Sequence, residues 1–243
     1  MNFTIITGDN GSGKTKIKDL LLSRKYLELI SHTTREARTK EKEGKDYYFV
    51  GTEDMKTMSF IEQIEFGGKT YGISLEEALT KLKTKKDLVV IAEPTGVVQI
   101  LKWLYGMSSV IEEITGSKIN IFLVHLIVPY EWRLFRILKE NLNNEEQDIA
   151  LFKSIRRVTR EKDVDGLMRK YVSDKTFSKV FRNLDESDKF TFEYLPVAQT
   201  PFPDTDDDLE DVPMEIIENL LIERKIIKKK ITRKQWNISL SRC

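Results

Sequence analysis

Cysteine is almost absent from this chain of 243 residues, because Cys243, the last residue, is the only one. A single cysteine cannot form a disulfide within the chain, which fits a reducing compartment. Histidine is scarce as well, with only His32 and His125, so we expect no structural zinc site. Basic and acidic residues number 40 and 39, and the net charge is +1. So balanced a charge does not favour a nucleic acid or an anionic membrane as partner.

Long apolar runs are also missing. No stretch approaches the roughly 18 uncharged apolar residues typical of a membrane-spanning helix. The first residues, MNFTIITGDN, lack the basic region, apolar run and cleavage site of a secretory signal. We therefore expect a soluble, cytoplasmic protein.

The apolar runs that are present alternate with helical patterns. Short β-prone runs predict strands at residues 3–7, 26–30, 47–50, 87–92 and 119–128. Helical spacing of apolar residues predicts helices at 14–23, 75–83 and 97–105, and a charged helical pattern covers 130–170. The polar stretch 31–49 predicts an exposed loop. Strands that alternate with helices indicate an α/β fold with a parallel, doubly wound sheet.

The composition changes after Pro196. Three prolines bracket the acidic run DTDDDLED, which predicts an exposed linker, and residues 215–230 regain a helical, basic pattern. We therefore divide the chain into a core domain, 1–195, and an acidic linker with a C-terminal helix, 196–243. That helix is expected to dock on the core, and a homodimer contact or a nucleic-acid contact is the alternative.

The strongest motif is GDNGSGKT, a full match to GxxxxGK[ST] between a predicted strand and a predicted helix. Backbone N–H groups of such a loop converge on phosphate oxygens, and the helix N-terminus favours an anion. Lys14 is expected to reach the β- and γ-phosphates, and the Thr15 hydroxyl to help hold Mg²⁺. The predicted ATP-binding residues of this loop are Gly8, Asp9, Asn10, Gly11, Ser12, Gly13, Lys14 and Thr15.

The next segment gathers a second set of phosphate-binding side chains. Ser31, Arg35, Arg38 and Tyr47 lie within 17 residues. Arginine forks match phosphate oxygens bidentately, and hydroxyl groups add donors. Taken alone, the segment fits a solvated charged loop equally well.

In order along the chain, the P-loop, SHTTREAR, GKDYYFV and FIEQIEFGGKTYG resemble the guanylate kinase family, over about residues 1–195. The resemblance implies a P-loop NTPase fold with a small acceptor-binding subdomain at about 31–85 and a helical lid at about 130–170. It also implies a transferase that uses ATP and Mg²⁺ to convert GMP or dGMP to the diphosphate.

Roles for individual residues follow from the same resemblance. The ligands implied for the acceptor phosphate are Ser31, Arg35, Arg38, Tyr47 and Tyr71. Glu62 matches the carboxylate that accepts hydrogen bonds from guanine, and Glu93 stands where the family has an aspartate with the same task. Guanine offers N1–H and N2–H donors, which adenine lacks. Without the resemblance, Glu62 would be a solvated helix residue, Glu93 a turn cap, and Tyr71 part of a turn.

The resemblance further implies arginines from the lid and a contact to the adenine of ATP. Arg136 and Arg157 are the first choices for catalysis, followed by Arg133, and the alternative for each is a solvated basic helix. Asn183 matches the position that contacts adenine. His32 is expected to face solvent, and His125 to be a core histidine.

Two departures from the family pattern leave the substrate open. Ile73 replaces a Ser or Thr that donates to guanine O6, so that Ser74 or another group must donate or the base preference changes. Ile91 stands where the family has an acidic residue, and the Gly-Arg-Gly stretch of the lid is missing. The alternatives are a kinase for another or modified nucleoside monophosphate, and an inactive guanylate-kinase-like binding module. The intact Lys14 and Thr15 argue against the inactive module.

Overall fold

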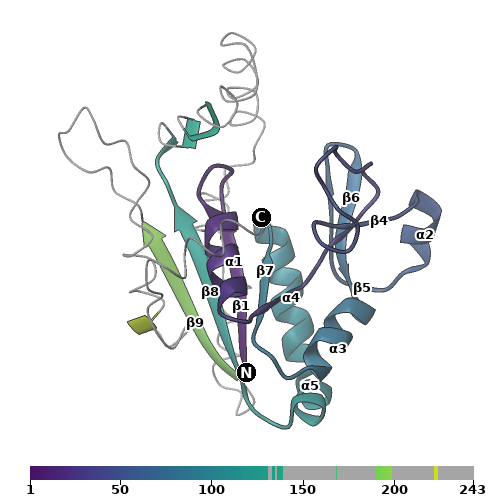
Figure 1. Ribbon diagram of the computed structural model, residues 1–243. Helices are drawn as coiled ribbons and strands as arrows, with labels where there is room; N and C mark the ends of the chain where they lie inside the picture. Colours follow the sequence, from purple (N-terminus) through teal and green to yellow (C-terminus); the bar gives the residue numbers. More distant parts are fainter. Residues whose placement is uncertain (131–132, 135, 139–167, 169–189, 199–221, 224–243) are drawn as a thin grey trace, which may run out of the picture.

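The computed structural model describes residues 1–130, 133–134, 136–138, 168, 190–198 and 222–223. The other residues are drawn as a thin grey trace in Figure 1. Most of the predicted lid, including Arg157, lies outside the described residues, as do Asn183 and nearly all of the predicted linker and C-terminal helix.

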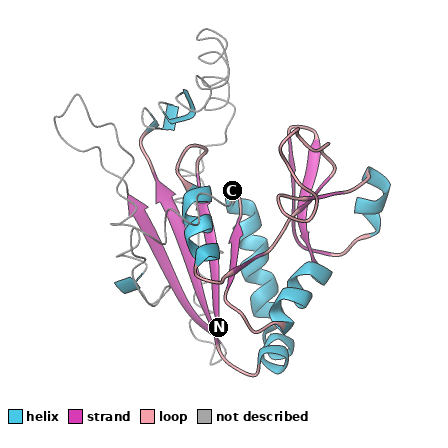
Figure 2. Cartoon of the chain, in the orientation of Figure 1, coloured by secondary structure: helices cyan, strands magenta, loops and turns pink. Residues whose placement is uncertain are grey.

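The core of the molecule is a five-stranded parallel sheet, drawn in magenta beside α1 and α4 in Figure 2. In spatial order its strands are β2 (Leu27–Glu28), β7 (Leu88–Ile91), β1 (Asn2–Gly8), β8 (Ile119–Ile127) and β9 (Phe190–Ala198). Each neighbouring pair is parallel. In β1, the central strand, six of seven residues are buried, as expected for a sheet covered on both faces. The prediction of a parallel sheet is confirmed.

Helices cover both faces of this sheet. Successive side chains of a strand point to opposite faces, so Ile5 and Ile6 of β1 belong to two different apolar layers. On the face of Ile6, α1 (Lys14–Ser23) packs through Ile17 and Leu21. The layer on the face of Ile5 contains residues of α3 (Leu75–Lys83), α4 (Pro94–Gly106) and α5 (Ser108–Thr115). The sheet is therefore doubly wound, as predicted.

A second, smaller sheet stands beside the first (Figure 1). Its strands, in spatial order, are β4 (Tyr48–Phe49), β3 (His32–Thr33), β6 (Lys69–Ser74) and β5 (Phe60–Phe66), and α2 (Thr52–Thr57) lies between β4 and β5 in the chain. The β5–β6 hairpin turns through Gly67 and Gly68, whose φ angles of 59° and 72° suit a tight turn with two left-handed residues. This sheet lies within residues 31–85, where we expected a small subdomain.

A reciprocal pair of hydrogen bonds joins the small sheet to α4, which packs on the main sheet. The backbone N–H of Gln63 donates to Gln99 Oε1, and Gln99 Nε2 donates to the Gln63 carbonyl, each at 3.0 Å. Gln63 lies on β5 and Gln99 on α4. The pair fixes the register of the small sheet against α4, and this places the neighbouring Glu62 beside the start of that helix.

The structure differs from the sequence-based expectations mainly at strands whose pairing partners are distant in the chain. The predicted loop 31–49 contains β3, and no local pattern predicted α2, α5, β5, β6 or β9. Glu62 lies on β5 and Tyr71 on β6, so the alternatives for these residues, a solvated helix position and a turn, do not apply. β9 continues to Ala198, past the predicted core boundary at 195. In the part of the chain that the structure describes, no helix is long and apolar enough to cross a membrane.

Candidate active site

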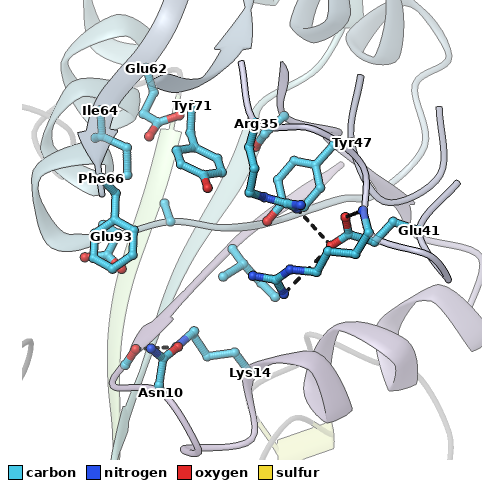
Figure 3. A pocket seen from close by; sticks show the side chains of 15 residues that line it. Asn10, Lys14, Arg35, Glu41, Tyr47, Glu62, Ile64, Phe66, Tyr71 and Glu93 are labelled. Carbon is cyan, nitrogen blue, oxygen red and sulfur yellow. Dashed lines mark hydrogen bonds and ion pairs between the residues drawn. The ribbon is translucent and has the colours of Figure 1, made fainter. Parts of the chain in front are cut away.

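One cavity of about 540 Å³ extends from the P-loop to the small sheet (Figure 3). The P-loop and the segment 31–47, in which the sequence predicted phosphate binding, both line this cavity, and so does the end of β7. The lining residues are Gly8, Asn10 and Lys14 from the P-loop, Ser31, Arg35, Arg38, Glu41, Tyr47, Glu62, Ile64, Phe66 and Tyr71 from the small sheet and its loops, and Ile91, Ala92 and Glu93. All seven predicted acceptor-binding residues line it.

The P-loop follows β1, and its lysine lies against the loop itself. Lys14 Nζ donates to the carbonyl oxygens of Gly8, at 2.6 Å, and Asp9, at 2.9 Å. Asp9 and Ser12 are buried, whereas Thr15 is exposed on the first turn of α1. Gly11 and Gly13 have left-handed φ angles of 76° and 93°. The loop thus has the strand–turn–helix geometry that the sequence predicted.

Two of the three predicted catalytic arginines contact this loop. Arg136 Nη1 donates to the Gly11 carbonyl at 3.1 Å, and Arg133 Nη2 lies 3.6 Å from Asp9 Oδ2. Burial lowers the pKa of Arg136 from its ordinary value. Both side chains are therefore next to the predicted ATP site, as an arginine acting on a transferred phosphoryl group must be.

On the opposite side of the cavity, Arg35 is held by a carboxylate that sequence analysis missed. Arg35 Nη2 donates to Glu41 Oε1 at 2.8 Å, and Glu41 Oε2 accepts the backbone N–H of Arg38 at 2.8 Å (Figure 3). These donors lower the pKa of Glu41, mainly through Arg35. The Arg38 side chain, 4.0 Å from Glu41 Oε1, is 77% exposed. The spacing of Glu41, three residues after Arg38 and six after Arg35, was the available signal.

Two tyrosines lie beside Arg35 in the same part of the cavity. The rings of Tyr47 and Tyr71 meet edge to face with centroids 5.9 Å apart, and the Arg35 guanidinium lies 5.3 Å from the Tyr47 ring centroid. Burial raises the pKa of Tyr47, so its hydroxyl keeps its proton and can donate. Figure 3 shows both rings beside Arg35.

Glu62 marks the other end of the cavity. Its side chain is 5% exposed and lies at the N-terminus of α4, so close that a Cβ on Gly96 would come within 2.7 Å of Glu62 Oε1. Burial raises the pKa of Glu62 to about 7, and the negative charge of Glu93 adds to this, while the Ile73 backbone N–H acts in the opposite direction. Glu93 is the N-cap residue of α4. Two carboxylates therefore face one end of the cavity.

Apolar side chains lie next to these carboxylates. Ile64 and Phe66 follow Glu62 at alternate positions of β5 and line the cavity with it, as do Ile91 and Ala92. Phe66 is 47% exposed. The arrangement suits a planar heterocycle whose N–H edge meets Glu62.

Ile73, which replaces the expected hydroxyl donor, and Ser74, its possible substitute, are not among the residues that line this cavity. Ile73 is fully buried in the core layer that also contains Ala78 and Leu82. Ser74 Oγ accepts the Glu77 backbone N–H at 3.1 Å and so caps α3. Ser74 therefore acts in capping and does not stand in for the missing hydroxyl donor.

The two histidines behave differently from each other. We expected His32 to face solvent, and this is wrong: it is 9% exposed, and its ring lies against the Tyr48 ring, tilted by 31° with centroids 4.7 Å apart. The reason is that β3 pairs with both β4 and β6, which enclose it. His125 is fully buried with Nδ1 2.8 Å from Tyr194 Oη, which confirms a core histidine. Within the described residues, no cluster of three or more His, Cys, Asp or Glu side chains could hold a metal.

Comparison with known proteins identifies the family. A guanylate kinase family model matches residues 1–112. The guanylate kinase of Wigglesworthia glossinidia brevipalpis is 31% identical over 161 residues, which cover 60% of this chain and 77% of that protein. The chain belongs to the guanylate kinase family. A second guanylate kinase, from Bartonella henselae, is 30% identical over 176 residues, covering 62% of this chain and 78% of its own.

Other guanylate kinases match shorter parts. The protein of Prochlorococcus marinus subsp. pastoris is 42% identical over 95 residues, which is 37% of this chain and half of that protein. A crystal structure of guanylate kinase from Anaplasma phagocytophilum superimposes on 94% of this chain and 87% of its own, with 16% identity and a TM-score of 0.43. The residues that the family model matches, 1–112, include the P-loop and every residue that lines the cavity.

The raised pKa of Glu62 predicts a pH-dependent stability. The folded state holds this proton more tightly than the unfolded chain, so the stabilisation is complete below pH 4.5 and is lost as pH rises through 7. Glu62→Gln should therefore be more stable than the wild type at pH 8, by about 2–3 kcal/mol, and gain nothing at pH 4. Urea unfolding at several pH values measures the difference.

The exposed Glu65 of the same strand provides the matched control, Glu65→Gln. A wild-type-to-variant difference that stays constant between pH 4 and pH 8 for Glu62→Gln would show that the carboxylate ionises normally.

Proposed function

We propose that this protein is an ATP-dependent nucleoside monophosphate kinase that transfers the γ-phosphoryl group of ATP to GMP or dGMP. One observation carries the proposal: a single cavity is lined by Lys14 of the P-loop, by Arg35 and by Glu62. A donor phosphate, an acceptor phosphate and a base can therefore be bound in one continuous space. Membership of the guanylate kinase family supports the same reaction.

The acceptor phosphate would be bound by the two arginines, Ser31 and the tyrosine hydroxyls. Glu41 and the Tyr47 ring already hold the Arg35 guanidinium at the cavity wall. An arginine that is oriented in advance loses less side-chain entropy when it binds phosphate. Ser31, next to β3, adds a hydroxyl from the same wall.

The base would be read by Glu62. In its ionised form the carboxylate only accepts hydrogen bonds, and it can take the N1–H and N2–H of guanine together. Glu93 provides a second acceptor at that end of the cavity, and Ile64 and Phe66 provide apolar surface for the ring. Adenine would leave the buried carboxylate without donors.

ATP would occupy the P-loop, where Lys14 exchanges the Gly8 and Asp9 carbonyls for phosphate oxygens. The exposed Thr15 hydroxyl fits one oxygen position of a Mg²⁺ ion, which takes most of its other ligands from phosphates and water. When bound, Mg²⁺ neutralises charge on the β- and γ-phosphates. Arg133 and Arg136 lie beside the loop, where they can stabilise the transferred group.

The transfer needs no strong base. An oxygen of the acceptor phosphate, already ionised, forms a bond to the γ-phosphorus while the bond from that phosphorus to the bridging oxygen of ADP breaks. The protein's task is to align the two phosphates and to surround them with positive charge. Roles for Arg157 and Asn183 stay predictions, since both lie outside the described residues.

The first prediction concerns the choice of acceptor. GMP and dGMP should be phosphorylated most efficiently, and IMP, which lacks the N2 amine, should have a kcat/KM lower by about 10-fold or more. AMP, CMP and UMP should be poorer still. A coupled assay of ADP release measures all of them. Ile73 and Ser74 do not line the cavity, so neither provides a donor to guanine O6, and a purine modified at that position could also be accepted. Turnover of pyrimidine nucleotides without turnover of GMP would refute the guanine assignment.

A second prediction separates the two phosphate sites. Lys14→Ala should lower kcat by about 100-fold or more, because it removes charge that stabilises the transferred phosphoryl group. Arg35→Ala should raise KM for GMP by about 10- to 100-fold and leave ATP affinity nearly unchanged. Lys16→Ala, an exposed lysine of the same helix, is the control. Loss of ATP affinity to the same degree in both variants would contradict this division.

A third prediction tests the position of Glu62. Gly96→Ala should push the carboxylate away, since the new Cβ would lie 2.7 Å from Oε1, and should raise KM for GMP by about tenfold. Gly106→Ala adds a methyl group to the same helix where nothing lies within 4 Å, and it is the matched control. Steady-state kinetics with GMP and ATP varied separately would detect the effect, and an unchanged KM for GMP in Gly96→Ala would argue against base reading by Glu62.

A further inference from the structure

A buried carboxylate lies behind the acceptor site, outside the cavity. Glu77, in the first turn of α3, is 7% exposed. We propose that Glu77 is a positioning residue that fixes the two chain segments carrying Ser31 and Tyr47 and thereby sets the affinity for the acceptor phosphate. This inference rests on the proposed function, because it assigns a control of that same site.

The contacts of Glu77 reach both segments at once. Oε1 accepts the backbone N–H of Ile30 at 3.1 Å, and Oε2 accepts the Tyr48 hydroxyl at 3.4 Å. Ile30 directly precedes Ser31, and Tyr48 directly follows Tyr47. One carboxylate therefore holds the residue next to each of two cavity-lining side chains.

The two segments are joined to each other by a short ladder and by the contact between the rings of His32 and Tyr48, and Glu77 adds a link from both segments to α3. β3 and β4 have two residues each, and pairs of such length are not stable by themselves. The Tyr48 backbone N–H donates to the Ser31 carbonyl at 3.0 Å, so the same neighbours are linked a second time. With Glu77 these bonds connect Ile30, Ser31 and Tyr48 to α3.

The sequence position of Glu77 makes its orientation informative. Ser74 and Glu77 have the spacing of a capping box, in which the glutamate side chain would turn back to the N-cap backbone N–H. Ser74 does accept the Glu77 backbone N–H, but the Glu77 carboxylate bonds instead to Ile30, 47 residues away. Lys81 Nζ, 3.5 Å from Oε1, partly balances the charge. The side chain thus serves a contact between segments and not only its own helix.

The experiment compares Glu77→Ala with two variants. Glu77→Gln keeps an oxygen that can accept the Ile30 N–H, and it should restore near-wild-type behaviour. Glu76→Ala removes the neighbouring, exposed glutamate of the same helix and is the matched control. Each protein is assayed for KM of GMP and of ATP separately, and amide hydrogen exchange is followed at Ile30 and Tyr48.

Glu77→Ala should raise KM for GMP by about tenfold, the effect of one lost hydrogen bond to a charged group, with KM for ATP unchanged. Exchange at Ile30 and Tyr48 should accelerate by about tenfold or more, while β1 stays protected. A loss of kcat with both KM values unchanged would indicate a structural role alone and overturn the proposal.

Hydrogen exchange keeps this test separate from the proposed function. If Ile30 and Tyr48 exchange equally slowly in Glu77→Ala and in the wild type, Glu77 does not hold these segments and the inference is wrong whatever the substrate. If exchange accelerates while the wild type turns over no guanine nucleotide, the positioning stands and the substrate assignment fails.

Discussion

The structure depends on holding two phosphate groups face to face although both are negative. Their repulsion in a partly closed cavity must be offset by donors fixed before the ligands arrive, because donors that have to be recruited lose entropy at that moment. A parallel sheet meets half of this requirement. The carboxyl ends of β1 and β7 lie at the same edge, so the P-loop after β1 and Glu93 after β7 reach one cavity. The small sheet and its loops provide the donors of the second phosphate site, because they place Arg35 across the cavity from Lys14.

The small sheet can act in this way only if it is attached firmly at one point and held in shape at another. The attachment is at α4, through the reciprocal Gln63–Gln99 pair and through Glu62, whose approach requires the absence of a side chain at Gly96. The shape is held nearer the arginines, where Glu41 binds the Arg35 guanidinium and the Arg38 backbone. Carboxylates therefore do much of the organising in a site that binds anions. Glu41 reduces the net positive charge of the cavity, but it fixes the direction of Arg35.

How much of this could be predicted depends on how local each feature is. The P-loop and α1 could be predicted from eight consecutive residues and from the apolar pattern on either side of them. The predicted bounds of α1, 14–23, and of α3, 75–83, are those observed. β5, β6 and β9 could not be found in the same way, because their stability comes from pairing with strands that the local pattern does not reveal. His32 was misplaced for that reason, since Tyr48 and Phe60 enclose it. The resemblance supplied Glu62 and Tyr71, but not Glu41 or Glu77, whose roles depend on which backbone N–H groups they meet.

The pKa of Glu62 connects the fold to selectivity. Burial raises the pKa of Glu62 to about 7, and the negative charge of Glu93 acts in the same direction, so the protonated form is populated near neutral pH. In the proposed function guanine needs the ionised form, so its binding near neutral pH would release that proton. The two guanine donors and the α4 N-terminus then stabilise the charge that burial disfavours. With a base that lacks these donors, the Glu62 carboxyl group would either stay protonated or carry a charge with no hydrogen-bond donor from the base. In the proposed function, a buried carboxylate whose pKa lies near neutrality would thus distinguish bases by the hydrogen-bond donors that they offer.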